Sequence, residues 1–301
     1  MPDPTNTFRH VVRRGEVLGR IASDNNVTVE DILAINPSIT DRDKIFEGQV
    51  ILIPRPGSQS DPQGPPAEGP PTTGEPIAAG AILSGMDANL PLTNQVACLK
   101  AEGFRFAVRY YTRKDRNRTL TLLEAQTLVK GGFQLGVVFE DGFPSNPAEQ
   151  PAFFTHDRGV GDGRAAHDRA LNKIGQPANT PIYFGVDFDA SPHDLATGIK
   201  RYFEGIREAL LAANNGTLKY QIGVYGSGLA CTELLKNGLA MFAWLSQSTG
   251  HRGSKEFKKQ KLYNLVQGPV RKNVCGLDEI DSDETNPDPV KFPPGLFTIA
   301  V

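Results

Sequence analysis

Residues 180–190 read TPIYFGVDFDA, and this stretch decides the fold of the longer part of the chain. It begins with a short apolar run, rich in β-branched and aromatic residues, that is typical of a strand buried on both faces. Asp187 and Asp189 follow. Because side chains alternate along a strand, we expect both aspartates to point to the same side at its C-terminal end. Alternatively, they cap the helix expected to begin within residues 191–200.

Similar strand-like runs alternate with helix-like runs on both sides of this stretch. The expected strands are residues 81–87, 105–111, 134–140, 181–187, 221–227, 241–247, 262–268 and 276–281, and the expected helices include 93–103, 121–132, 163–175, 196–215 and 228–238. This alternation predicts an α/β fold of the TIM-type (β/α) barrel class over residues 81–301. A doubly wound open sheet is the alternative. Nearly every strand ends in polar residues, as expected where strand ends surround one active site, and this favours the barrel.

The polar residues at these strand ends would converge on one side of a barrel. They are Asp87, Arg109, Tyr110, Tyr111, Glu140, Asp141, Asp187, Asp189, Tyr225, Ser227, Trp244, Ser246, Gln247, Gln267, Asp278, Glu279, Asp281 and Asp283. Crowded carboxylates push one another's pKa values apart, and cleavage of a glycosidic bond needs one protonated and one ionised carboxyl group. Six of the other side chains are candidate sugar contacts: Arg109, Tyr111, Tyr225, Trp244, Gln247 and Gln267. For Trp244, a buried barrel position is the alternative.

A second, smaller domain is expected at residues 7–54. Its pattern is strand, helix, helix, strand, and Thr28 with Asp31 has the spacing of a capping box before the second helix. Residues 55–80 are rich in Pro, Gly, Ser and Thr and nearly devoid of large apolar side chains, so we expect a flexible linker there.

The motifs of residues 7–54 resemble the LysM family. They are V-x-x-G-E-x-L-x-x-I-A, then VTVEDILAIN, then the closing run IFEGQVILIP. The resemblance implies binding of polymers that contain N-acetylglucosamine, such as peptidoglycan or chitin, in a shallow groove between two loops. The corresponding residues here are Gly15, Glu16, Val17, Leu18, Asn36, Pro37, Ser38 and Ile39. Core packing is an equal alternative for Val17, Leu18 and Ile39.

Residues 81–301 resemble a glycoside-hydrolase-like barrel domain formerly of unknown function, which is distantly similar to the family 25 lysozymes. The matching runs are GMD, RFAVRYYT, LGVVFE, TPIYFGVDFD, IGVYGSG, AWLSQS and NLVQG. The resemblance implies catalytic roles for Asp187 and Asp189, for the first-strand Asp87, and for the last-strand Asp281.

One position departs from the lysozyme pattern. The lysozymes have Glu where this chain has Asp189, and Glu140 could supply the longer carboxyl group. We therefore expect Glu140 or Asp189 to be the general acid and Asp187 to stabilise positive charge or orient the substrate. For Glu140, a salt bridge to Arg109 is the alternative.

Composition excludes several other classes of protein. The net charge of −2 gives no reason to expect a nucleic acid partner, and no run is long enough to enter a membrane. The cysteines, Cys98, Cys231 and Cys275, are too few and scattered to predict a disulfide framework or a metal site, and the five histidines lack ligand spacing. We expect no cofactor and no metal. The glycines of GVGDGR, residues 159–164, follow no strand and predict a mobile loop.

These patterns favour a muramidase-like peptidoglycan hydrolase directed to the cell wall by its LysM module. A wall-binding protein with a degenerate barrel and a metal-dependent hydrolase are the alternatives. The N-terminus lacks the pattern of a signal peptide, so the expectation is synthesis in the cytoplasm and export by a non-classical route. That expectation fits an exported antibacterial effector or a lytic enzyme, with a secretion machine or an inhibitor protein as further partners.

Overall fold

A computed structural model of the chain describes residues 7–12, 16–25, 27–36, 39, 41–42, 45, 50–54, 81–141 and 150–301. The chain forms two compact units, Met1–Gly69 and Pro70–Val301. The expected linker, residues 55–80, lies outside the described residues. Within the described part, no helix has both the length and the apolar character needed to cross a membrane.

The N-terminal unit has the predicted βααβ order. Its elements are β1 (Thr7–Val11), α1 (Leu18–Asp24), α2 (Val29–Ile35) and β2 (Val50–Pro54), and the two strands pair antiparallel. Thr28 and Asp31 form the expected capping box, with the Asp31 N–H donating to Thr28 Oγ1 over 3.1 Å. The helices pack on the sheet through Ile21, Ile32, Ile51 and Ile53. Two of the residues expected to bind sugar, Leu18 and Ile39, lie in this small core.

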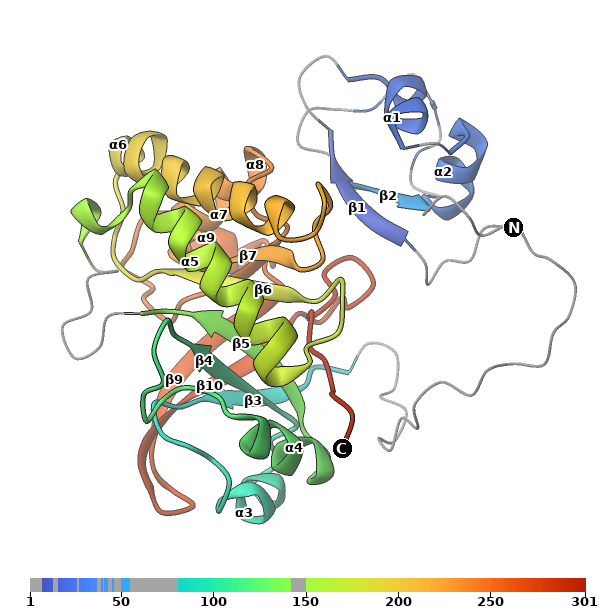
Figure 1. Ribbon diagram of the computed structural model, residues 1–301. Helices are drawn as coiled ribbons and strands as arrows, with labels where there is room; N and C mark the ends of the chain where they lie inside the picture. Colours follow the sequence, from blue (N-terminus) through green and yellow to red (C-terminus); the bar gives the residue numbers. More distant parts are fainter. Residues whose placement is uncertain are drawn as a thin grey trace, which may run out of the picture. The chain divides into compact units, whose positions relative to one another are not determined.

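The C-terminal unit is a closed eight-stranded barrel surrounded by helices, which confirms the predicted fold class (Figure 1). Its strands are β3 (Ser84–Asp87), β4 (Phe106–Tyr111), β5 (Gln134–Phe139), β6 (Pro181–Val186), β7 (Gln221–Gly226), β8 (Phe242–Leu245), β9 (Leu265–Val274) and β10 (Leu277–Thr285). Its α-helices are α3 (Val96–Ala101), α4 (Leu122–Lys130), α5 (His156–Asp168), α6 (Pro192–Asp194), α7 (Lys200–Ala212), α8 (Gly228–Lys236) and α9 (Ser254–Lys259). A 3₁₀ turn, η2 (Pro151–Phe153), precedes α5, and the π-helical segments η3 (Arg169–Ile174) and η4 (Leu195–Ile199) continue α5 and α6.

The last strand runs in the opposite direction to the other seven. Strands β3 to β9 are parallel to their neighbours, whereas β10 pairs antiparallel with both β9 and β3 and closes the barrel. The reason is the short connection at Cys275 and Gly276, both at positive φ, because a tight hairpin can join only antiparallel strands. As a result, Asp281 lies opposite Asp87 in the register, and Asp283 lies opposite Gly85.

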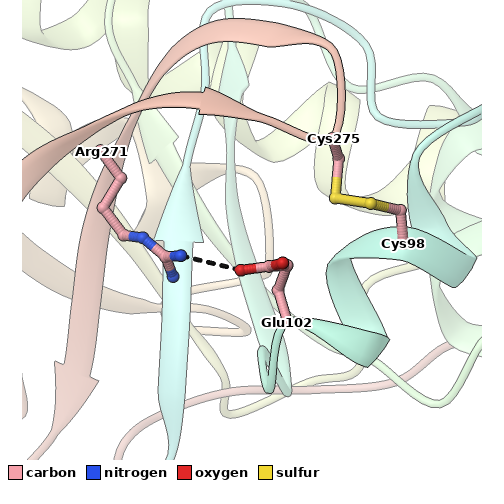
Figure 2. Close-up of a disulfide and its surroundings, with 4 residues drawn as sticks. All are labelled: Cys98, Glu102, Arg271 and Cys275. Carbon is pink, nitrogen blue, oxygen red and sulfur yellow. Dashed lines mark hydrogen bonds and ion pairs between the residues drawn. A yellow bond between two sulfur atoms is a disulfide. The ribbon is translucent and has the colours of Figure 1, made fainter.

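The prediction about the cysteines is wrong, because Cys98 and Cys275 form a disulfide across 177 positions of sequence. It joins α3 to the turn of the β9–β10 hairpin, and Figure 2 shows an ion pair between Arg271 and Glu102 beside it. Sequence spacing alone did not indicate that the hairpin would bring these two residues together. The disulfide fixes the strand that carries Asp281 and Asp283.

The prediction of a loop at residues 159–164 is also wrong, because these residues lie inside α5. The glycines allow helix α5 to pack closely against helix α7 (Figure 1). A Cβ atom at Gly159 would lie 2.0 Å from the Tyr202 carbonyl oxygen, and one at Gly205 would lie 2.3 Å from the His156 carbonyl oxygen. The glycines therefore allow contact between helix backbones.

The barrel wall separates two apolar layers. Inside the barrel, Phe106, Val108, Tyr110, Val138, Tyr183, Tyr225, Phe242, Trp244 and Leu265 pack together. A larger cluster, which includes Tyr111, Phe139 and Phe184, lies between the strands and the helices. Alternate residues of β4 thus face different layers, as strand geometry requires, and this decides which strand-end side chains reach the barrel interior.

Candidate active site

Acidic and aromatic side chains converge at the C-terminal ends of the parallel strands. We call this region the mouth and define it by Glu140, Asp187, Tyr225, Gln247 and Asp281. Glu140 and Asp187 directly follow β5 and β6, and Tyr225 lies near the end of β7. Burial raises the pKa of the Tyr225 hydroxyl well above its ordinary value, and the negative charges of Asp187, Asp87 and Glu140 raise it further. These three carboxylates therefore lie close enough to the Tyr225 hydroxyl to act on its pKa.

Below the mouth lies a buried layer made of Asp87, Tyr110, Trp244, Gln267 and Asp283. Asp87 Oδ1 accepts a hydrogen bond from the Tyr110 hydroxyl over 3.2 Å, and Asp87 Oδ2 accepts one from Gln267 Nε2 over 2.8 Å. Burial and then the charge of Asp281 raise the Asp87 pKa to about 7. With 2% of its surface exposed, Asp87 supports the mouth from beneath.

Gln267 links this layer to the mouth. Its Oε1 accepts from the Tyr225 hydroxyl over 2.9 Å and from the Gln247 backbone N–H over 3.2 Å. The Gln247 side chain in turn donates to Asp281 Oδ1 over 2.9 Å. Asp281 is half-buried, and this burial raises its pKa. A continuous chain of hydrogen bonds thus runs from Asp87 to Asp281.

Glu140 lies in the mouth and is ion-paired. Arg118, from the β4–α4 connection, contacts Glu140 Oε1 at 3.0 Å, and its guanidinium group lies 4.2 Å from the centre of the Tyr110 ring. The Glu140 side chain crosses Gly185, where an added Cβ would be 3.4 Å from Oε2. The alternative of a salt bridge for Glu140 thus applies, but the partner is Arg118 and not Arg109.

Asp189 does not share the position of Asp187. Strand β6 ends at Val186, so both aspartates lie beyond it and the alternation of a strand does not apply to them. Asp189 Oδ1 accepts from the Arg252 backbone N–H over 2.7 Å, and Oδ2 pairs with the Arg252 side chain at 2.8 Å. Its carboxylate fixes the loop that leads to α9, and we leave it out of the mouth.

Arg109 and Tyr111 are not in the mouth, contrary to the sequence-based assignment. Arg109 is fully buried on the helix side of β4, where its Nε lies 2.8 Å from Glu124 Oε1 of α4. The Tyr111 hydroxyl donates to Gln176 Oε1 over 3.0 Å in the same outer layer. Strand β4, FAVRYY, is buried on both faces, so its sequence pattern could not show which residues point inward.

Trp244 and Gln267 are also unavailable for direct sugar contact. Trp244 is 1% exposed, its ring lies 4.4 Å from that of Tyr225, and its Nε1–H donates to Asp283 Oδ1 over 2.8 Å. The alternative of a buried barrel position therefore applies to Trp244. Gln267 is enclosed by the bonds given above. Of the six predicted sugar contacts, Tyr225 and Gln247 remain at the mouth.

The residues expected to bind sugar in the LysM domain also divide into exposed and buried side chains. Val17 is 61% exposed, and Glu16 Oε2 lies 2.7 Å from His10 Nε2. Leu18 and Ile39 belong to the core, and Asn36 clamps α2 to β2 through hydrogen bonds to the Ile32 and Leu52 backbones. Gly15, Pro37 and Ser38 lie outside the described residues. Val17 is thus the exposed candidate among the described residues, while Glu16 is engaged by His10.

Some residues of the site were missed from the sequence. Tyr110 and Asp283 were recognised only as strand-end residues, although their positions two residues from Val108 and Asp281 would have placed them on the inner face. Arg118 lies in a connection, where no periodicity exists to indicate its direction. Within the described ranges, no group of three or more His, Cys, Asp or Glu side chains has the arrangement of a metal site.

Family models match both parts of the chain. The model of the Rv2525c-like, glycoside hydrolase-like domain matches residues 97–284, and the LysM model matches residues 10–54. The resemblances read from the motifs are therefore confirmed. An uncharacterized protein of Bacillus subtilis strain 168, FadG, is 31% identical over 200 residues, which are 64% of this chain and 33% of that protein. The chain thus spans only a third of this relative's length.

Two solved structures are similar to this chain to different degrees, and the first shares its barrel fold. The Tat-secreted protein Rv2525c of Mycobacterium tuberculosis, in complex with L-tartrate, has a TM-score of 0.54 at 20% identity, covering 68% of this chain and 94% of that one. A family 25 glycosyl hydrolase from Bacillus anthracis has a TM-score of 0.39 at 12% identity, covering 67% and 88%.

Proposed function

Because the chain belongs to the Rv2525c-like, glycoside hydrolase-like family and carries a LysM domain, we propose that it binds peptidoglycan and cleaves its glycan strands as a muramidase. The observation that carries this proposal is the convergence of Glu140, Asp187 and Asp281 around Tyr225 and Gln247. Glycosidic cleavage requires two carboxyl groups in different protonation states. Glu140, Asp187 and Asp281 belong to or follow three different strands and have different surroundings. Different surroundings favour different protonation states.

We assign the general acid to Asp281. It is the half-buried carboxyl group of the mouth whose pKa is raised, which favours the protonated form that a general acid needs. Glu140 is ion-paired with Arg118, and Asp189 is held by Arg252. This assignment replaces the sequence-based choice between Glu140 and Asp189. Asp187 then stabilises the positive charge that develops on the sugar, and Glu140 orients the substrate.

The LysM domain would hold the barrel on its polymer. Linking a binding module to a catalytic module raises the local concentration of substrate without any further contact. The exposed Val17 is the described side chain best placed for the sugar. The disulfide between Cys98 and Cys275 supports a location outside a reducing cytoplasm, as expected for a protein that acts at the cell wall.

Release of new reducing ends from purified peptidoglycan tests the proposal. Asp281→Asn and Asp187→Asn should each lower release by at least about a hundredfold, because each removes a group that acts in the transition state. Asp168→Asn is the matched control: this exposed aspartate lies at the C-terminal end of α5, and its loss should leave release unchanged. Unaltered release by both mouth variants would contradict the assignment, and mass analysis of the products would identify the bond cut.

One observation favours a second candidate, a wall-binding protein without turnover. Asp189, at the position where the lysozymes have Glu, is engaged by both the backbone and the side chain of Arg252. Peptidoglycan binding that is lost with Val17→Ser, together with no release of reducing ends by the full chain, would establish this second function. Toxicity only after direction to the periplasm would support a role as an exported effector.

A further inference from the structure

Two buried carboxyl groups face each other inside the barrel. Asp87 on β3 and Asp283 on β10 lie on the same inner face, and their carboxyl groups are within hydrogen-bonding reach. Asp283 is fully buried. Within the described ranges, neither group forms an ion pair with a Lys, Arg or His side chain. Two adjacent ionised carboxylates without a cation would be strongly unfavourable in such a place.

The hydrogen bonds indicate which of the two carries the proton. Asp87 accepts one bond on each oxygen, from Tyr110 and from Gln267. Asp283 accepts a single bond, from Trp244 onto Oδ1, and its Oδ2 is buried without a donor. Donors stabilise the charged form of a carboxyl group, so the negative charge belongs on Asp87. A proton on Asp283 Oδ2 would satisfy that atom by donating to Asp87.

We propose that Asp283 is a neutral carboxylic acid at neutral pH and a positioning residue, whose Oδ2–H group donates to Asp87 and so fixes Asp87 and Gln267 beneath the mouth. The protonation state is independent of the proposed function. The positioning role rests on that function, because Gln267 bonds both Tyr225 and the Gln247 backbone.

The groups around the pair support this state. Tyr110 faces it from β4, Tyr183 from β6, Tyr225 from β7 and Asp281 from the mouth end of β10. None of these side chains is a cation. The nearest guanidinium group to the Tyr110 ring, that of Arg118, is paired with Glu140. Burial, followed by the charge of Asp87, raises the pKa of Asp283 well above its ordinary value.

The carboxyl carbons of ¹³C-labelled aspartate, followed by NMR from pH 4 to pH 9, test the protonation state. In the full chain, Asp283 should keep the shift of a protonated carboxyl group at neutral pH, while Asp87 titrates near pH 7. The signals are assigned with Asp87→Asn and Asp283→Asn.

Asp283→Asn and Asp283→Leu separate the two possible states. Asn is neutral, has the same shape, can donate to Asp87 and can accept from Trp244, so the Asp87 midpoint should stay near its wild-type value. Leu removes the donor, and the midpoint should rise. If Asp283 were ionised, Asp283→Asn would remove a like charge and lower the Asp87 midpoint by about one pH unit or more, which would overturn the proposal. Should the Leu variant not fold, the Asn variant decides alone.

The positioning role of Asp283 is tested by measuring the kinetics of peptidoglycan hydrolysis. Asp283→Asn should keep turnover within a few-fold of wild type, and Asp283→Leu should lower kcat on the order of tenfold with KM little changed. Equal loss in both variants would overturn the role of the donated hydrogen bond. Absence of turnover in the wild-type chain would contradict the proposed function and the positioning role, while the NMR titration would still decide the protonation state.

Discussion

The two faces of the barrel wall treat buried charge differently. On the outer face, the Arg109 guanidinium pairs with Glu124 and also donates to the carbonyl oxygens of Ala88 and Arg118. On the inner face, Asp87 and Asp283 meet as two groups that would carry the same charge. The outer arrangement pairs each negative charge with a cation, while the inner one must retain a proton.

This difference distinguishes structural charge from functional charge. The buried ion pair between Arg109 and Glu124 fixes helix α4 on strand β4 and is not accessible to a ligand. Crowded acids have displaced pKa values, and this property is what acid–base chemistry requires. From sequence, Asp87 was expected to be catalytic and Arg109 to contact the sugar, because both lie near the ends of expected strands. The following experiments test the contrast.

Arg109→Met should have the largest effect, a loss of about 3–5 kcal/mol in the free energy of unfolding, because it leaves Glu124 buried without its cation. Urea unfolding measures this loss. Arg109→Met combined with Glu124→Met should recover part of it, since no unpaired charge would remain. Arg105→Met, four residues away and exposed, is the control and should change stability by less than about 0.5 kcal/mol. Equal effects of the two arginine changes would refute the outer ion pair.

Replacing both Cys98 and Cys275 by Ser should cost about 2–4 kcal/mol, because the disulfide closes a very long loop in the unfolded chain. The wild-type protein in reductant should unfold like this variant. Arg271→Gln removes the ion pair between the same two elements (Figure 2) and should cost no more than about 1 kcal/mol, since that pair is exposed. A comparable loss in both variants would show that the hairpin does not depend on its covalent link.

The sequence predicted the alternation of strands and helices well. It predicted poorly whether a given side chain points into the barrel or outward. Eight apolar runs with polar ends identified the barrel, and Thr28 with Asp31 marked a helix start, because both signals are local. The inward or outward direction of Arg109 and Tyr111 depends on which layer each face of β4 meets, and β4 is buried on both faces. The reversal of β10 follows from one short turn, and the disulfide depends on that turn. The strand reversal and the disulfide join residues far apart in the chain, so no local sequence pattern indicates them.

The buried carboxyl group of Asp87 on the inner face should also make the free energy of unfolding depend on pH. The Asp87 pKa is raised to about 7 in the folded chain, from 3.8 as its ordinary value. Above about pH 4 the unfolded chain has released this proton while the folded chain still holds it, so stability falls as pH rises. The contribution is up to about 1.4 kcal/mol per pH unit and ends near pH 7.

Asp87→Asn should therefore flatten the fall in unfolding free energy between pH 4.5 and pH 7. Urea unfolding at several pH values, compared with the wild type, measures the change in slope. The exposed Asp168→Asn should leave the slope unaltered. An unchanged slope in Asp87→Asn would mean that Asp87 is ionised throughout this range in the folded chain as well, which would contradict its raised pKa.

The smallest expected effect is the coupling between Trp244 and Asp283. A hydrogen bond between neutral groups contributes about 0.5–1.5 kcal/mol, whereas one to a charged group contributes about 1.5–3 kcal/mol. Trp244→Phe alone also leaves a cavity, so a double-mutant cycle with Asp283→Ala is needed to cancel that cost. Trp244 is the only tryptophan, and unfolding must therefore be followed by circular dichroism. Coupling below about 1.5 kcal/mol would support a neutral Asp283, while a larger value would place the negative charge on Asp283 and make the two faces of the barrel wall more alike than we infer.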